Sequence, residues 1–403
     1  MNKLWTRIFV FAAALLLLLF FSNDFGMVDI QKTSIVTAIG IDAAEEAGKI
    51  DVTAQIAVPS ETGQKASNVE VSGAATVGEA IAEFNQKTGW YPTLVHCRLV
   101  LLGEDIARGD VFDVLDFFLR SQYVEDSCLV AVCEGRAAEA LQAKSPVGDL
   151  TFSAIEKVLS SEAQQTGLVS VTSLREFAMG YFSESGSGFL PYLSVKREAM
   201  SDGGGSGSAG EQSGAQGGST QNAAQGGGEN DADVFEASRT MLFDAGRGVA
   251  TLEAEETLAF NLAASKTGLA SGEVTVLEEG REVTYTLRMK IGKRSASLRL
   301  EGGVPVLTFR IRAQAQVTDA NAAGSREEIA QTAFAPAHVL RAAEEKFKAQ
   351  LSAAFEKSRE SGCDLFRLRQ KLWRAFPSRF GGMQATLLRD VYAVYDIAFD
   401  TLR

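Results

Sequence analysis

Histidine and cysteine are the residues of this chain best suited to acid–base, nucleophilic or metal chemistry, and they are few. The 403 residues include only two histidines, His96 and His338, and four cysteines. His96 and Cys97 are neighbours in the apolar run TLVHCRLVLL, which predicts a buried strand over residues 93–102. Neighbours on a strand point to opposite faces, so this pair does not supply a nucleophile and its base. His338 falls in the first turn of a predicted helix, and we expect structural roles for both histidines.

The other cysteines also lack a catalytic or metal-binding spacing. Cys128 and Cys133 are five residues apart on one predicted strand, so they face opposite ways and cannot form a disulfide with each other. A cross-strand disulfide to Cys97 remains open. The sequence contains no C-x-x-C, H-E-x-x-H, G-x-S-x-G or P-loop pattern.

An acidic run at Glu253, Glu255 and Glu256 could hold calcium, although a solvated surface is the simpler interpretation. We therefore predict no catalytic residue, no cofactor and no metal site, and a protein that is not an enzyme. The net charge of −12 argues against nucleic acid, because a phosphate backbone requires a basic surface. With four cysteines in 403 residues, the domains must derive their stability from hydrophobic cores.

The N-terminus has the pattern of an export signal that is retained. Lys3 and Arg7 precede an uninterrupted apolar run from Ile8 to Phe21. Neither an A-x-A cleavage site nor a cysteine that could carry a lipid follows this run. Residues 1–28 are therefore predicted to be a signal anchor or transmembrane segment, and the positive-inside rule places residues 29–403 outside the cytoplasm.

Residues 29–145 are predicted to form an α+β domain with an open mixed sheet and helices packed on it. The signature Thr76-Val-Gly-Glu79 predicts a helix start, and Gly89 its end. The other predicted elements are strands at 34–42, 49–58, 93–102 and 127–133, and helices at 111–119 and 136–141.

Residues 146–265 are predicted to form a middle α+β domain that contains a long loop. Its predicted elements are helices at 152–159 and 173–182, a strand at 189–195 and a hairpin that turns at 245–248. Residues 202–233 carry no apolar side chain larger than alanine, which predicts a disordered Gly/Ser-rich loop. Both flanks are strand-like, so we expect the loop to connect two strands of one sheet, although a hinge between two domains is the alternative.

Residues 266–403 are predicted to form a βββααβ domain. Strands at 283–289, 295–300 and 306–317 alternate between apolar and polar residues, as in a sheet with one wet face. A helix is predicted to begin at Pro336 and to be interrupted at Gly362. Helical structure is predicted to continue over residues 364–376. A final strand at 390–402 should rejoin the sheet. The predicted fold class is α+β, with an N-terminal membrane anchor followed by three mixed α+β domains.

The second of these helices offers the single candidate surface for contact with a partner protein. This surface consists of Asp364, Phe366 and Trp373. Leu365, Leu368 and Leu372 can supply its buried stripe. Phe366 and Trp373 are seven residues apart and would share a neighbouring face. That face is either core or an aromatic anchor for a partner protein.

Four segments, in order, resemble the Ger(x)C family, the C subunits of nutrient germinant receptors of spore-forming bacteria. Each segment is weak alone, and it is their shared order and spacing that carry the resemblance. They are residues 29–42 (DIQKTSIVTAIGID), residues 96–141 with the motifs LGEDIA, VFDVLDFFLR and GRAA, residues 190–191 with MLFDAGRGVATL at 241–252, and GCDLFRL at 362–368 with WRAFP at 373–377.

The resemblance implies a non-catalytic receptor subunit required for spore germination. It implies three α+β domains on the outer face of the spore inner membrane, beside a channel-like A subunit and a transporter-like B subunit that are both multipass proteins. Members of the family usually carry a lipidated cysteine near the position of Asp24, whereas this chain reads Ser22-Asn-Asp-Phe25. Arg367 and Arg369 stand at positions where members of the family more often have a Gly-Phe-Gly-like run. The alternative is a membrane-anchored, extracytoplasmic solute- or cell-wall-binding protein.

Overall fold

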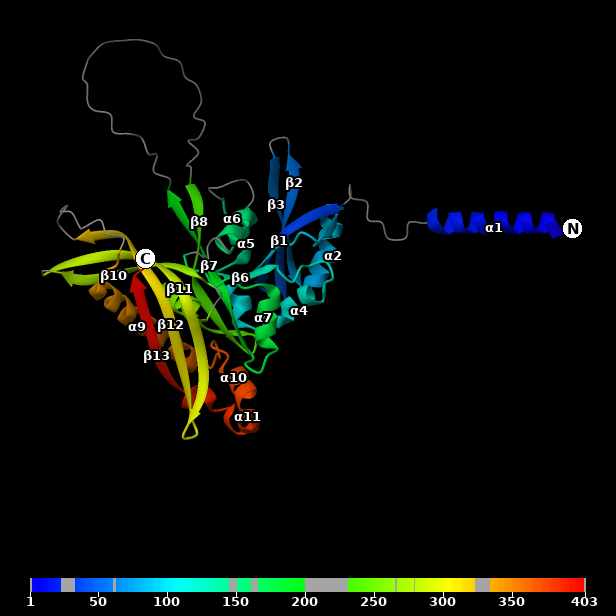
Figure 1. Ribbon diagram of the computed structural model, residues 1–403. Helices are drawn as coiled ribbons and strands as arrows, with labels where there is room; N and C mark the ends of the chain where they lie inside the picture. The colour runs from blue at the N-terminus through cyan, green and yellow to red at the C-terminus, as the bar shows by residue number, and fades with distance from the viewer. Residues whose placement is uncertain are drawn as a thin grey trace, which may run out of the picture.

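A computed structural model of the chain shows a folded body built on two β-sheets (Figure 1). The residues described are 2–22, 33–60, 63–144, 151–160, 166–199, 231–264, 267–278, 280–322 and 334–401. The N-terminal helix α1 covers Asn2–Ser22, within the predicted anchor. Among the described helices, none meets the combined length and hydropathy criterion for a membrane-spanning segment. Residues 23–28, which complete the predicted anchor, lie outside the described ranges.

The first sheet, sheet A, has nine strands in the order β3-β2-β1-β5-β6-β7-β8-β9, with β4 paired to β1. β1 lies near its centre, antiparallel to β2 and parallel to β5. The predicted open mixed sheet is therefore confirmed. The strands are β1 (Thr33–Ala43), β2 (Ile50–Ser60), β3 (Gly63–Ala74), β4 (Tyr91–Thr93), β5 (Leu99–Gly103), β6 (Leu129–Cys133), β7 (Ser187–Ala199), β8 (Asp231–Asp244) and β9 (Arg247–Leu252).

Helices cover both faces of sheet A, and each face has its own apolar cluster. One face is covered by α2 (Val77–Thr88), α3 (Glu104–Arg108), α4 (Phe112–Arg120) and α7 (Leu174–Tyr181). The opposite face carries α5 (Ala137–Gln142) and α6 (Thr151–Val158). Because both faces are buried, the central strands are continuous apolar runs, as in Leu99–Gly103, where every residue is buried.

The predicted caps of α2 are present. The Thr76 side chain accepts a hydrogen bond from the backbone N–H of Glu79 at 3.1 Å, and the Glu79 carboxylate accepts one from the N–H of Ala75 at 2.7 Å. Gly89 ends the helix in the left-handed region at φ 72°, where glycine has no Cβ to clash.

The strand predicted over residues 93–102 is wrong in its first half. The chain turns between β4 and β5, and the N–H of Cys97 donates to the carbonyl of Leu94 at 2.9 Å. As a result His96 is exposed rather than buried, whereas Cys97 still faces the core. A local turn bond therefore outweighs the β pattern of these residues.

The strands on either side of the predicted loop pair with each other. β7 and β8 run antiparallel, and the register extends from Ser187 opposite Asp244 to Ala199 opposite Asp231. This confirms that both flanks belong to one sheet. The loop itself, from residue 202 to residue 230, lies outside the described residues, and residues 231–233, which we assigned to it, belong to β8. The hairpin predicted at 245–248 is confirmed, with its turn at Ala245-Gly246.

The second sheet, sheet B, has the order β10-β11-β12-β13, with β12 and β13 parallel. Its strands are β10 (Leu269–Glu278), β11 (Arg281–Glu301), β12 (Val304–Ala322) and β13 (Tyr392–Thr401). The strands predicted at 283–289 and 295–300 are one strand, β11, with an irregularity between Ile291 and Lys293. The wet face is confirmed, because apolar residues of β11 such as Val283 and Leu287 are buried while Arg288 and Lys290 are exposed.

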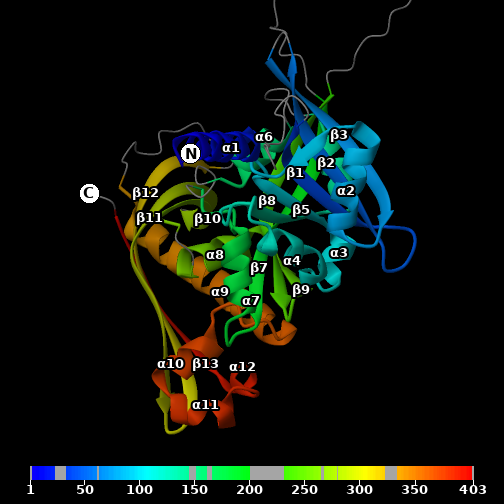
Figure 2. The same cartoon turned by 90° about the vertical axis from the view of Figure 1, so that its right-hand side faces the viewer.

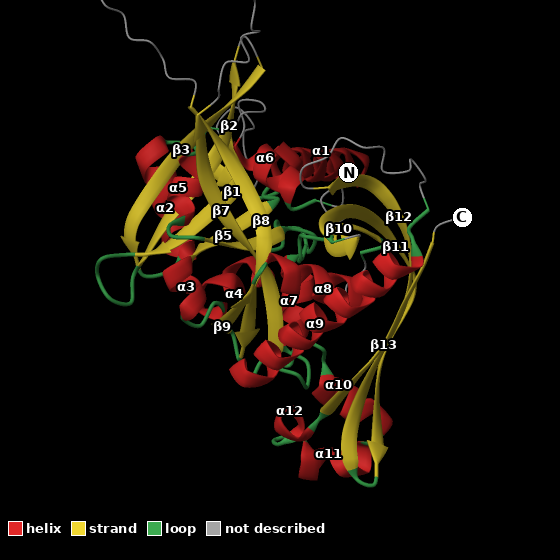
Figure 3. Cartoon of the chain, turned by 90° about the vertical axis from the view of Figure 1, so that its left-hand side faces the viewer, coloured by secondary structure: helices red, strands yellow, loops and turns green. Residues whose placement is uncertain are grey.

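Helices α8 (Ala254–Ala264) and α9 (Ala337–Ser361) pack between the two sheets, as Figures 2 and 3 show. α9 confirms the helix predicted from Pro336 to Gly362, and Val339, Ala343, Phe347 and Leu351 are buried along it. α8 was not predicted. Three short helices follow α9 near the far end of sheet B: α10 (Leu368–Ala375), α11 (Pro377–Met383) and α12 (Leu387–Asp390).

The helix predicted to begin at Asp364 begins at Leu368 instead. Residues 364–367 form a turn in which the N–H of Arg367 donates to the carbonyl of Asp364 at 3.0 Å. Arg367 itself lies in the left-handed region at φ 55°, which interrupts the helical path.

Sheet A is shared between the segments 29–145 and 146–265. Val132 and Cys133 of β6 pair with Tyr192 and Leu193 of β7 across the predicted boundary. The structure is thus α+β with two sheets, and the subdivision of sheet A into two domains stays a prediction.

Candidate functional site

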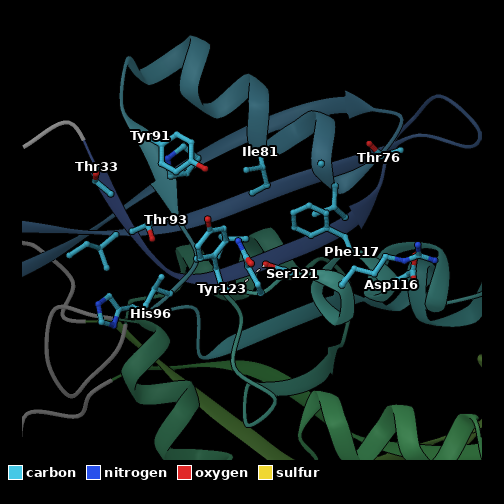
Figure 4. A pocket seen from close by; sticks show the side chains of 18 of the residues that line it. Thr33, Thr76, Ile81, Tyr91, Thr93, His96, Asp116, Phe117, Ser121 and Tyr123 are labelled. Carbon is cyan, nitrogen blue, oxygen red and sulfur yellow. Dashed lines mark hydrogen bonds and ion pairs between the residues drawn. The ribbon is translucent and has the colours of Figure 1, made fainter. Parts of the chain in front are cut away.

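An open groove lies where β1 begins and β4 pairs with it, and we call it the α2–α4 groove (Figure 4). Four segments build it: the start of β1, the N-terminal half of α2, the chain from β4 to the following turn, and α4 with the turn after it. Its volume is about 1220 Å³. Figure 4 shows the rings of Tyr91, Phe117 and Tyr123 around the same space.

The hydrophobic core next to the α2–α4 groove is formed by residues other than the exposed rings of the groove. Val77, Phe84 and Leu94 are buried beneath the groove and pack in the cluster that joins α2 and α4 to sheet A. Tyr91 and Tyr123 are by contrast about half exposed, at 49% and 53%. These rings therefore contribute surface to the groove and little to the core.

Polar side chains also line the α2–α4 groove, among them Thr93, His96 and Gln122. On α4, Asp116 forms an ion pair with Arg120 at 2.7 Å, while Asp113 is exposed. The Thr76 hydroxyl oxygen accepts the capping N–H of Glu79. An apolar space with a carboxylate rim can bind an apolar group that carries a positive charge.

The two histidines lie at the surface, whereas the four cysteines are buried. His338 contacts the Glu278 carboxylate at 2.5 Å near the surface, and this contact lowers the pKa of Glu278. All four cysteines are free and buried, so the disulfide to Cys97 that the sequence left open is not formed in this structure. The Cys97 and Cys128 side chains share one apolar cluster, while Cys133 faces the other, as predicted.

Three of the four buried thiols, those of Cys128, Cys133 and Cys363, are held in their neutral form. The hydrogen bond to Cys97, followed by burial, raises the pKa of Cys128, and burial raises the pKa of Cys133 and Cys363. A thiolate is the reactive form of cysteine, so these residues are poor nucleophiles at neutral pH.

The acidic run near residue 255 forms ion pairs with α9. Glu255 contacts Lys346 at 3.0 Å and Glu256 contacts Lys357 at 2.5 Å. Within the described residues, no group of three histidine, cysteine or acidic side chains is arranged to hold a metal ion.

The candidate contact residues do not share a surface. Phe366 is buried against Phe260, Phe309 and Phe355, whereas Trp373 is 47% exposed. The prediction that Phe366 and Trp373 lie on one helical face is wrong, because Phe366 precedes the start of α10. Leu365, Leu368 and Leu372 are buried, as predicted.

Asp364 has a structural role at the start of α10. Its carboxylate oxygens accept hydrogen bonds from the N–H groups of Leu368 at 2.6 Å and Arg369 at 2.8 Å. Its own N–H donates to the Ser187 hydroxyl at 3.0 Å, so the residue also joins the C-terminal helices to the start of β7. Burial lowers the pKa of Lys371, which donates to the Phe366 carbonyl at 2.6 Å.

A buried polar network that the sequence did not reveal joins α8 to sheet A. The Thr257 hydroxyl donates to the Thr240 hydroxyl at 3.1 Å, and Thr240 donates to Ser170 at 2.8 Å. Ser170 in turn donates to the Asn261 side chain at 2.9 Å. The positions of these serine, threonine and asparagine residues in the sequence form no recognisable motif. The network therefore becomes visible only in the fold, which brings the residues together.

Two of the four segments that carry the family resemblance, residues 29–42 and 96–141, also meet in space. The buried Asp42 carboxylate of β1 accepts hydrogen bonds from the N–H groups of Ala137 at 2.7 Å and Ala138 at 2.9 Å, at the start of α5. A Cβ on Gly103 would lie 2.2 Å from the Asp42 carboxylate, so only glycine leaves room here.

The fold and the groove define a two-sheet α+β protein with an open groove beside the start of β1. Residues 26–195 match the family model described as spore germination protein N-terminal domain. Residues 238–386 match the model described as spore germination B3/GerAC like, C-terminal. The chain belongs to the Ger(x)C family of spore germination proteins.

A solved structure has the same fold. The crystal structure of the GerBC protein is 14% identical to this chain, with a TM-score of 0.51 over 93% of this chain and 100% of that one. Among curated proteins, no match was found. At this identity, the similarity to GerBC concerns the fold.

Proposed function

We propose that this chain is the non-catalytic, extracytoplasmic subunit of a nutrient germinant receptor. In this role it lies on the outer face of the spore inner membrane and works beside the multipass A and B subunits. The main support for the proposal is that the N-terminal and C-terminal domain models of spore germination proteins match successive parts of this chain. The buried, neutral thiols and the surface pairing of His338 support a role in binding rather than in chemistry.

We further propose that the N-terminal segment keeps the protein at the membrane without a lipid. The described large apolar side chains of α1 are exposed and have no core of their own to enter, among them Trp5, Phe9, Phe11 and Leu16. Mass spectrometry of the N-terminus tests this proposal. A mature chain that starts between residues 22 and 30 would contradict it.

The division of the extracytoplasmic part into residues 29–145, 146–265 and 266–403 is also a proposal. Sheet B, which belongs to the last segment, is separate from sheet A and supports the boundary near residue 266. Trp373 remains a proposed partner contact, because its ring is exposed on α10 while the leucine stripe of that helix is buried.

Deletion of the gene tests the proposed function. Spores that lack the protein should fail to respond to one class of nutrient, while they still germinate by a route that bypasses nutrient sensing. Complementation with the full-length chain should restore the response. Spores with an unchanged response to every nutrient that the parent strain senses would contradict the proposal.

A further inference from the structure

The α2–α4 groove gathers exposed apolar side chains to a degree that the rest of the described body does not match. Outside α1, five exposed large apolar residues lie in or beside it: Ile35, Trp90, Tyr91, Val95 and Tyr123. They come from separate segments of the chain and surround one space. A contiguous apolar surface of this kind is typical of an interaction site.

The size of the α2–α4 groove favours a stretch of polypeptide over a small molecule. Its volume of about 1220 Å³ exceeds the roughly 300–1,000 Å³ of ordinary ligand pockets. It is also open to solvent, and the rings of Tyr91, Phe117 and Tyr123 line it (Figure 4). Aromatic side chains are common anchors at protein interfaces.

The charge around the groove indicates the chemistry of its occupant. Asp113 is exposed and forms no ion pair with another described residue, and Asp116 is paired with Arg120. The rim is therefore acidic, and the whole chain carries a net charge of −12. An anionic lipid surface would be repelled, whereas a segment with a lysine or arginine beside apolar side chains would be attracted.

The position of the groove places it close to the predicted anchor. Thr33, the first described residue after α1, lines the groove. Ten residues separate it from Ser22 at the end of α1, and a chain of that length spans at most about 40 Å however it is arranged. A partner that is embedded in the same membrane can therefore present an extracytoplasmic segment to this groove.

We propose that the α2–α4 groove binds an extracytoplasmic segment of a membrane-embedded partner, and that this segment inserts apolar side chains between Tyr91 and Tyr123 and places a cation against Asp113. This inference rests on the proposed function, which supplies the membrane-embedded partners, and it assigns the surface through which one of them docks.

Surface variants test the inference in the membrane-bound complex. Val95→Lys and Tyr123→Lys place a charge in the groove, and Asp113→Lys reverses the charge of its rim. Each should reduce the amount of multipass subunit that co-purifies with the tagged chain at least tenfold. The matched control is Tyr392→Lys, which alters a 67% exposed tyrosine on β13 and should retain the complex. Because all four side chains are exposed, the melting temperatures should stay unchanged.

Photo-crosslinking identifies the occupant directly. A benzophenone side chain in place of Tyr123 should form a crosslink to a peptide of a multipass subunit that contains apolar residues and a lysine or arginine, and the same group at position 392 should not. Crosslinks to a second copy of this chain, to lipid, or to no protein would overturn the inference while the complex still co-purifies. If the wild-type chain binds no multipass subunit at all, the proposed function fails as well.

Discussion

The carboxylate of Asp42 lies 2.9 Å from the backbone nitrogen of Ala138, across the interface between β1 and α5. The same carboxylate accepts the N–H of Ala137, and Arg136 lies beside it. One strand residue thereby satisfies two amide groups at the start of a helix that is 95 residues away in the sequence.

Replacement of Asp42 should leave both amides buried and unpaired. We expect Asp42→Ala to lower the free energy of unfolding by about 2–4 kcal/mol, because a buried unsatisfied amide costs roughly 1–3 kcal/mol. Chemical denaturation measures the change. Glu139→Ala, at an exposed position of the same helix, is the control and should cost less than about 1 kcal/mol. Equal effects of the two variants would show that the Asp42 contacts contribute little.

Phe366 and Trp373 should differ sharply in their effect on stability. Phe366→Ala removes a ring that contacts three other buried phenylalanines and should cost roughly 3–5 kcal/mol. Trp373→Ala alters a half-exposed ring and should change the free energy of unfolding by about 0.5 kcal/mol or less. Thermal and denaturant unfolding of both variants decides this, and a large loss in Trp373→Ala would place that ring in the core.

The loop between β7 and β8 should be removable. We expect a deletion of residues 203–229, closed by a short glycine turn, to change the free energy of unfolding by less than about 1 kcal/mol, because loop length enters only logarithmically. The deletion keeps Asp231–Asp233, since the Asp233 side chain accepts the N–H of Lys144 at 2.8 Å. Separation into two independently unfolding parts would contradict the pairing of β7 with β8.

The partly buried amine of Lys371 should give stability a recognisable pH dependence. Burial lowers its pKa below the ordinary 10.5, so between the folded and unfolded pKa values the unfolded chain binds more protons. Stability of the wild type should therefore rise with pH across that interval, and Lys371→Met should lose this rise. The exposed Lys348→Met on α9 is the comparison. Parallel stability–pH curves for wild type and Lys371→Met would contradict burial of the amine.

The sequence predicted correctly those elements whose ends are marked by capping residues or whose apolar residues recur with a regular period. Thr76 and Gly89 mark both ends of α2, and the apolar residues of α9 recur every fourth position up to Gly362. α8 was missed because residues 257–263 are buried on every side, so the helix shows no amphipathic period. β11 was divided in two because the irregularity near residue 292 interrupts its alternation.

The candidate site could not be predicted from spacing. The α2–α4 groove combines residues from Thr33 to Tyr123 that only the sheet and its helices bring together. The proposed pair of Phe366 and Trp373 relied on an unbroken helix, and the left-handed Arg367 separates the two. The turn at Arg367 thus leaves Phe366 in the core, whereas Trp373 is half exposed on α10.

Isolation of the tagged, full-length chain from spore inner membranes tests the central claim most directly. The account predicts that two multipass proteins encoded beside this gene co-purify with it in stoichiometric amounts under mild detergent. Recovery of the folded chain from the membrane without either multipass protein, or recovery from the soluble fraction, would contradict its assignment as a receptor subunit.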